Sequence, residues 1–246
     1  MFATMSFVQI EQSLGLSFSL WTQILTLVFA AIFGLDMCSQ TSGNESRPNS
    51  NVSRMEKLTI DQLHELRLRI FDNAESLHKE ATLLLDNGYY ARAFLLAHFT
   101  CEELGKIPIV VGAIGRLLKN EAVDWRKVMR RFRDHKAKVD SDDFHQYVFG
   151  IELDLLRDSD LKWLEAAKVA SKSRVNHKNN STYVDVQDAA VISPLEQITK
   201  EQAVEMLDRA FQSLRAHWQT ESMTNPIVVA ANKVLQATPK SGAPEL

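Results

Sequence analysis

The feature that most constrains the fold is a run of apolar residues that recurs every three or four positions after Leu58. Its members are Leu63, Leu66, Ile70, Ala74, Leu77, Ala81 and Leu84. This spacing is typical of one face of a helix and does not fit the alternation of a strand. Thr59, followed by Gln62, predicts a capping pair at the start of the helix, and Asn87-Gly88 predicts its end because glycine readily takes a positive φ. The folded part of the chain therefore begins with a long helix that buries one face.

Similar periodicity further along the chain predicts an all-α fold, a helical bundle. A second helix is expected from Tyr89 to about Leu118, with Pro108 marking a kink or a break. Further helices are expected at residues 124–138, 144–156, 160–177 and 194–219, with an extended segment at Tyr183–Val186. Only 9 Gly and 6 Pro occur in 246 residues, which argues against a β-sandwich with many turns.

The N-terminal residues 1–38 are hydrophobic and leave two interpretations open. Leu20–Leu35 carries no charge and approaches the roughly 20 apolar residues that a membrane-spanning helix needs. If it inserts, the basic residues that follow it keep the rest of the chain in the cytoplasm, tethered to the inner membrane. Alternatively, the natural start is Met55, because residues 39–54 are polar and linker-like. The expected organisation is completed by a helical domain at 55–219 and a loosely attached tail at 220–246.

Charge and cysteine content narrow the classes of function. The net charge is -3, so the whole molecule lacks the positive footprint of a protein that wraps nucleic acid, although a local basic patch is compatible with it. Cys38 and Cys101 lie in different segments and build neither a disulfide framework nor a zinc knuckle. Motifs of nucleotide-binding loops, zinc hydrolases and serine hydrolases are absent from the sequence. We expect no cofactor and no metal, since the adjacent Glu102 and Glu103 point in different directions on a helix.

Two charged motifs interrupt the apolar pattern. Glu102, Glu103 and Lys106 lie in the sequence CEELGK, inside an otherwise apolar helix. Glu102 and Lys106 are four residues apart and can pair, but the apolar flanks predict that some of these charges are buried, where each needs a partner. His135 and Lys138, in the sequence HKAK, share a helical face and could supply that partner. The pattern fits both a structural ion network and a catalytic site.

Taken together, these motifs resemble the AbiV family of the HEPN superfamily. The resemblance rests on the tyrosine-rich turn at Tyr89-Tyr90, the following ARAFLLA, the EELGK and HKAK motifs, and Tyr183-Val184-Asp185. It spans about Met55 to Gln219. It implies a HEPN-like helical bundle, usually a homodimer, that acts in abortive infection by arresting the growth or translation of the infected cell before the phage multiplies.

The resemblance also implies a metal-independent endoribonuclease with an R-x4-6-H motif, in which Arg holds the phosphate and His transfers protons. It places this motif at Arg174 and His177, our predicted catalytic pair, although only two residues separate them. Arg92 with His98 and Arg130 with His135 also match the spacing. The apolar sequence around His98 favours a histidine buried in the core, and the basic sequence around His135 favours a solvated face. The residues predicted to shape the site are Glu102, Glu103, Lys106, His135, Lys138, Tyr183 and Asp185. The residues predicted to contact RNA are Arg130, Arg131, Arg133, Lys136 and Lys178.

The sequence leaves open whether the protein is an enzyme. In the alternative, it is a non-catalytic effector or sensor that binds a ribosomal, phage or membrane partner through the basic stretch from Arg130 to Lys138. A further alternative is an antitoxin or a scaffold. The partners expected are a second copy of the chain, RNA or the translation machinery, a phage-encoded trigger, and a membrane contacted through residues 20–35.

Overall fold

The computed structural model describes residues 58–149, 173–187 and 190–237. Five sequence-based predictions therefore lie outside the described residues, wholly or in part. They concern the hydrophobic segment at 1–38, the linker at 39–54, the C-terminal part of the helix expected at 144–156, most of the helix expected at 160–177 and the end of the tail expected at 220–246.

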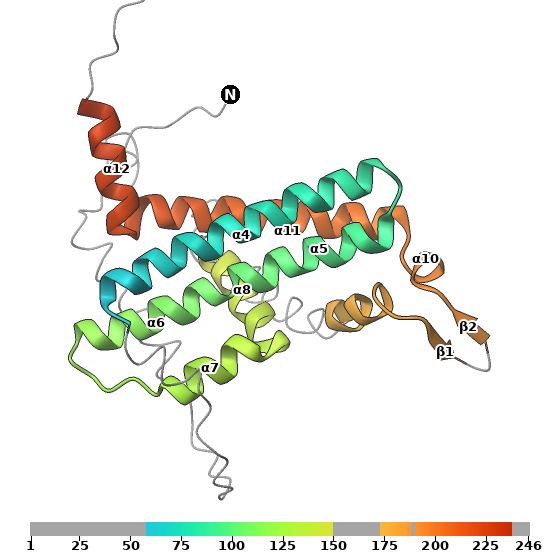
Figure 1. The fold of residues 1–246 in the computed structure, drawn as a ribbon, viewed down its shortest axis with the longest axis horizontal. Helices are drawn as coiled ribbons and strands as arrows, with labels where there is room; N and C mark the ends of the chain where they lie inside the picture. Colours follow the sequence, from blue (N-terminus) through green and yellow to red (C-terminus); the bar gives the residue numbers. More distant parts are fainter. Residues whose placement is uncertain (1–57, 150–172, 188–189, 238–246) are drawn as a thin grey trace, which may run out of the picture. The chain divides into compact units, whose positions relative to one another are not determined.

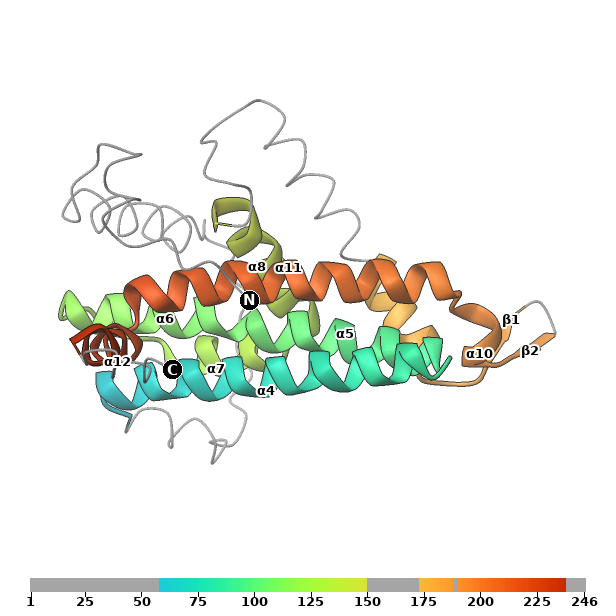
Figure 2. The same ribbon diagram turned by 90° about the horizontal axis from the view of Figure 1, so that it is seen from above.

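Three long helices form the centre of the fold: α4 (Ile60–Asp86), α5 (Tyr90–Leu104) and α11 (Lys200–Thr224). They run side by side, and each contacts the other two (Figures 1 and 2). Thr59 and Gln62 make the predicted reciprocal cap at the start of α4, and Gly88 has a φ of 80° in the turn that follows it. The all-α prediction is thereby confirmed, and both ends of the first helix are where the sequence placed them.

The predicted second helix is divided in two, α5 and α6 (Lys106–Leu118), and the boundary lies at Gly105. Pro108 has no amide hydrogen to donate to the carbonyl of Leu104, which weakens the helix at this point. Gly105 also meets the backbone of Lys138, because a Cβ at position 105 would lie 2.0 Å from the Lys138 carbonyl oxygen. Glycine is therefore required by the close approach of another helix.

The basic stretch does not follow the predicted boundaries. A single helix at 124–138 was expected, whereas α7 (Trp125–Arg133) ends at Asp134 and α8 (His135–Phe149) begins immediately afterwards. The side chain of Asp134 accepts a hydrogen bond from the backbone N–H of Ala137 at 3.2 Å. Asp134 thus has an extended backbone and caps the next helix with its side chain. Aspartate favours such a cap over a position inside a helix, which is why the helix ends here.

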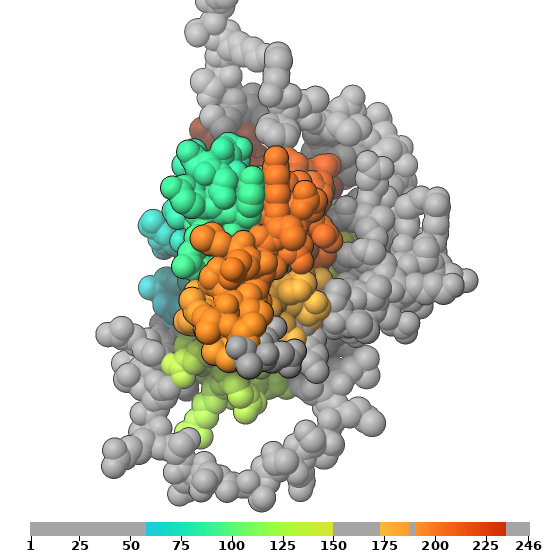
Figure 3. Space-filling view, turned by 90° about the vertical axis from the view of Figure 1, so that its right-hand side faces the viewer, coloured from blue at the N-terminus to red at the C-terminus, as the bar shows by residue number. Residues whose placement is uncertain are grey.

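Beyond the central helices, residues 173–180 are helical, and a small antiparallel hairpin follows. It pairs β1 (Asp185–Gln187) with β2 (Ala190–Ile192), with Val186 opposite Val191. The extended segment predicted at Tyr183–Val186 is confirmed in part, and the hairpin is an addition to the all-α prediction. A short helix, α10 (Pro194–Gln197), leads from the hairpin into α11. Figure 3 looks onto the end of the bundle that carries the hairpin and α10.

The C-terminal boundary predicted at Gln219 falls inside α11, which continues to Thr224 and is followed by α12 (Pro226–Ala237). Glu221 is fully buried and accepts hydrogen bonds from Arg67 of α4 at 2.7 and 2.9 Å. Asn225, also buried, donates to Glu221 at 2.7 Å and to the carbonyl of His64 at 3.2 Å. Residues 220–225 therefore belong to the packed bundle, in contrast to the loosely attached tail that was expected there.

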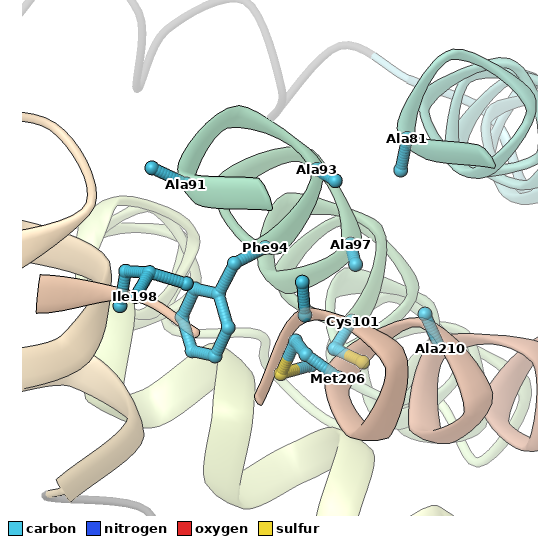
Figure 4. Packing of buried hydrophobic residues seen from close by; sticks show 10 residues of the cluster. Ala81, Ala91, Ala93, Phe94, Ala97, Cys101, Ile198, Met206 and Ala210 are labelled. Atoms are coloured by element: carbon cyan, nitrogen blue, oxygen red, sulfur yellow. The ribbon is translucent and has the colours of Figure 1, made fainter. Parts of the chain in front are cut away.

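Two groups of buried apolar residues form the core. In one, small residues such as Ala81, Ala93 and Ala97 lie at the contact of α4 with α5, which lets the two helices approach closely. Figure 4 shows Phe94 reaching toward Ile198 in this group. The other group surrounds the α5–α6 boundary and contains Leu63, Ile70, Ala74, Leu104, Ile107, Val110, Ile114 and Leu214.

None of the described helices combines the length and the apolar character that crossing a membrane requires.

Candidate functional site

The buried carboxylate of Glu102, in α5, lies within 3.3 Å of four side-chain nitrogen atoms. The residue is 3% exposed. Its Oε1 lies 3.2 Å from Nε2 of His98 and 3.3 Å from Nζ of Lys178. Its Oε2 lies 2.6 Å from Nδ1 of His135 and 2.7 Å from Nζ of Lys138. We call these five residues the Glu102 cluster.

Local sequence and helix packing explain why these groups meet. His98 precedes Glu102 by four residues on α5, which places the two on one face. His135 and Lys138 are three residues apart in the first turn of α8 and also share a face. The contact of Gly105 with the backbone of Lys138 brings α8 against α5 beside Glu102. The cluster is therefore assembled where the α5–α6 boundary crosses the start of α8.

Hydrogen bonding keeps Glu102 ionised. Burial alone would raise the pKa of Glu102, but the hydrogen bonds from His98, Lys138 and His135 outweigh it and hold this pKa well below its ordinary value. As a carboxylate, Glu102 can only accept, so Nδ1 of His135 carries the hydrogen of the 2.6 Å contact. In a neutral ring Nε2 then bears the lone pair. Because the side chain of His135 is 53% exposed, its ring can meet an external molecule.

A second buried carboxylate, Asp143 of α8, lies in the same region. It contacts the guanidinium groups of Arg174 and of Arg209 in α11, and its side chain is 1% exposed. Arg174 and Lys178 are four residues apart and share one face of the helical segment at residues 173–180. Two ionic contacts from this face attach the segment to the bundle. One of these contacts reaches Asp143, and the other reaches Glu102.

The predicted catalytic pair, Arg174 and His177, lies close to the Glu102 cluster. Arg174 hydrogen-bonds the buried Asp143. The ring of His177 packs edge-on against Phe94, with centroids 6.1 Å apart. These contacts tie the two side chains to different neighbours, and the catalytic role of the pair stays a prediction.

The other predicted site residues are divided between the cluster and its surroundings. Glu102, His135 and Lys138 meet as predicted, whereas Lys106 pairs with Glu103 at 2.6 Å and not with Glu102. Tyr183 is 67% exposed beside the hairpin, and Asp185 is exposed in β1.

Of the five residues predicted to contact RNA, Lys178 is buried against Glu102. Lys136 pairs with Asp140, and Arg131 donates to Oγ of Ser141 at 3.0 Å. Arg130 and Arg133 are exposed.

Sequence reasoning missed a second polar group in the core. Oδ1 of Asp142 accepts hydrogen bonds from Oγ of Ser213 and from Nε2 of His217, the latter at 3.1 Å. The ring of His145 stacks on that of His217, with centroids 3.6 Å apart and planes at 6°. Ser213 and His217 are polar residues within the apolar stripe of α11, which was a usable signal. The side chains of Asp142, His145 and His217 are closed to solvent, so we assign this group to the architecture. Among the residues described, no set of three or more His, Cys, Asp or Glu side chains is arranged to hold a metal ion.

The stacked histidines make stability depend on pH. Burial lowers the pKa of His145 well below its ordinary value, and lowers the pKa of His217 to about 3. As pH falls below about 6.5, the unfolded chain binds protons at these rings and the folded chain does not, so the free energy of unfolding decreases. Burial raises the pKa of Asp142, and proton uptake there offsets part of the loss at lower pH. Each net proton corresponds to about 1.4 kcal/mol per pH unit.

We therefore expect urea denaturation of the native chain to show a loss of stability between about pH 6.5 and pH 5. In His145→Phe, the slope of the free energy of unfolding against pH should be smaller by the equivalent of about one proton. Equal slopes in the two proteins would contradict this explanation.

The comparisons with known proteins agree with the sequence resemblance. The family model described as AbiV, of the HEPN group, matches residues 62–215, which include every member of the Glu102 cluster. No curated protein and no solved structure matches the chain. The family match covers more than half of the 246 residues. The chain therefore belongs to the AbiV family of HEPN domains.

Proposed function

We propose that this chain arrests phage-infected cells as a metal-independent endoribonuclease, with His135 as its acid–base group. One observation carries the proposal: an exposed imidazole is held through Nδ1, at 2.6 Å, by a buried and ionised carboxylate. A carboxylate in this position fixes the tautomer of the ring and stabilises the imidazolium that forms when Nε2 accepts a proton. Membership of the AbiV family supports the wider role in abortive infection.

The proposed reaction uses the 2′-hydroxyl of RNA. Nε2 of His135 takes the proton from this hydroxyl, and the 2′ oxygen attacks the adjacent phosphorus. The bond from phosphorus to the 5′ oxygen then breaks, leaving a 2′,3′-cyclic phosphate. The 5′ oxygen takes a proton from solvent, and the imidazolium of His135 returns its proton to solvent. Lys138 and Lys178 place two positive charges beside the single carboxylate of Glu102, an excess that favours an anionic phosphodiester near His135.

Two features of the chain favour His135 over His177. Four residues separate Arg130 from His135, which matches the spacing implied by the family resemblance, whereas two separate Arg174 from His177. In addition, Arg174 is bound to Asp143, while Arg130 is exposed. The RNA-cleaving role therefore fits better at the start of α8 than at residues 173–180.

The test compares the purified full chain with its His135→Ala and His177→Ala variants on single-stranded RNA, with a chelator present. We expect the native chain and His177→Ala to cleave RNA, and His135→Ala to have lost cleavage. A substrate with 2′-deoxyribose at every position should resist cleavage, because it lacks the attacking hydroxyl. Loss of cleavage in His177→Ala alone would return the role to Arg174 and His177. Cleavage of the deoxy substrate would contradict the reaction.

A second candidate function is a non-catalytic effector that stops growth by binding. The exposed basic side chains of α7 favour it, because they provide a binding surface whether or not His135 is catalytic. Expression of the full chain in a bacterial host would then arrest growth with intact RNA, and His135→Ala would arrest growth equally well. Dimer formation and a phage-encoded trigger also stay predictions.

A further inference from the structure

The outward face of α7 carries a stripe of three arginines. Arg126, Arg130 and Arg133 occupy positions i, i+4 and i+7, which share one face of a helix, and all three are exposed. At about 1.5 Å of rise per residue, the stripe extends over about 10 Å. The sequence of α7, WRKVMRRFR, contains no acidic residue.

The opposite face of α7 holds the stripe in its outward position. Trp125, Val128, Met129 and Phe132 pack against the core group around the α5–α6 boundary. The two flanking aspartates are engaged with backbone: Asp124 accepts from the N–H of Lys127 at 2.9 Å, and Asp134 accepts from that of Ala137. The arginines therefore form a fixed positive row.

Neighbouring basic residues contribute less to this row, because they have other roles. Arg131 donates to Ser141, Lys136 pairs with Asp140, and Lys138 contacts Glu102. Within the long basic stretch of the sequence, the exposed row of Arg126, Arg130 and Arg133 on α7 is therefore the part best placed to bind an external anion. His135, two residues beyond Arg133, begins the next helix at the end of that row.

We propose that Arg126, Arg130 and Arg133 bind the backbone of single-stranded RNA and lead it to His135. A guanidinium matches the phosphate group through paired hydrogen bonds. A lipid surface fits less well, because interfacial helices bury an apolar face in the bilayer and the apolar face of α7 is already packed against the core. The direction of the strand toward His135 rests on the proposed function, whereas binding to the row does not.

Binding is measured with the full chain carrying His135→Ala, so that no substrate is cut, and a labelled single-stranded RNA over a range of salt concentrations. The test variant adds Arg126→Gln, Arg130→Gln and Arg133→Gln. The control variant instead adds Arg69→Gln, Lys79→Gln and Arg215→Gln, which removes the same charge from exposed positions on α4 and α11. Equal thermal midpoints for the two variants establish that both are folded.

We expect the test variant to lose affinity at least about tenfold, and the slope of log affinity against log salt to become shallower by about 2, since each phosphate contact on a single strand contributes about 0.7. The control variant should keep both the affinity and the slope. Equal binding by the two variants would overturn the inference, as would absence of RNA binding, or row-dependent binding to anionic phospholipid vesicles in place of RNA.

The result also separates this inference from the proposed function. If the chain with His135 intact cuts no RNA but the row is needed for binding, the ribonuclease proposal fails and the row stands. If the three substitutions, made with His135 intact, leave both binding and cleavage at the native level, the row fails, and the ribonuclease proposal then rests on His135 and Glu102 without Arg130.

Discussion

Replacing Arg67 with alanine is expected to lower the free energy of unfolding by about 3 to 5 kcal/mol. Arg67 is 2% exposed, and its Nε and one terminal nitrogen bind the same oxygen of the fully buried Glu221. Its other contacts are Thr224 at 3.0 Å and the ring of His64 at 3.1 Å. The substitution leaves the carboxylate of Glu221 buried without its cation, which is the costly way to break a buried ion pair. Urea denaturation at neutral pH measures the loss.

The control is Arg69→Ala, two residues further along α4. Arg69 pairs with Glu65 at 3.2 Å, but the two side chains are 75% and 56% exposed, and such a surface pair contributes about 1 kcal/mol or less. A double variant, Arg67→Met with Glu221→Leu, removes both charges and should be more stable than Arg67→Ala, because no unpaired charge is left. If Arg67→Ala lost no more stability than Arg69→Ala, the buried pair would not hold α4 to α11.

Gly105→Ala is expected to cost about 3 kcal/mol or more and to abolish RNA cleavage, if the ribonuclease proposal holds. The conformation of Gly105 is ordinary for a helix, so an alanine is not strained by its own φ and ψ. The cost comes from the Cβ, which would lie 2.0 Å from the carbonyl oxygen of Lys138 and must push α8 away. Displacement of α8 moves Lys138 and His135 from Glu102. Both thermal unfolding and the cleavage assay should report the change.

Gly115→Ala, in α6, provides the matched control. Among the described residues, a Cβ at position 115 meets no atom within 4 Å outside its own helical turn, and alanine favours a helix over glycine by up to about 1 kcal/mol. This variant should be as stable as the native chain, or slightly more so, and should retain activity. If Gly105→Ala behaved like Gly115→Ala, the close crossing of α8 over the α5–α6 boundary would be refuted.

Much of the fold could be predicted from the sequence because its signals are local. The apolar period of α4, its cap at Thr59 and the glycine turn at Gly88 depend on residues within a few positions of one another. The break predicted at Pro108 is confirmed, but it lies three residues earlier, at Gly105, where α8 crosses. The break at Asp134 was not predicted, because it depends on a side-chain cap that competes with helix continuation.

The candidate site divides in the same way. Glu102, His135 and Lys138 could be predicted to meet, because a charge within an apolar helix requires a partner and the HKAK motif offers two on one face. Lys178 was predicted to contact RNA but binds Glu102, a residue 76 positions away. The attachment of Arg174 and Arg209 to Asp143 also joins distant segments. Periodicity carries no information about such pairings, since it describes each helix separately.

The Glu102 cluster also limits the order in which this sequence can evolve. Losing Glu102 first would leave Lys138 and Lys178 buried beside each other without an anion, a state that selection for a folded protein would remove. Losing one lysine first leaves the carboxylate with other donors. A lineage that loses the Glu102 cluster should therefore replace the lysines before the glutamate, and present-day intermediates should retain the glutamate with fewer cations around it.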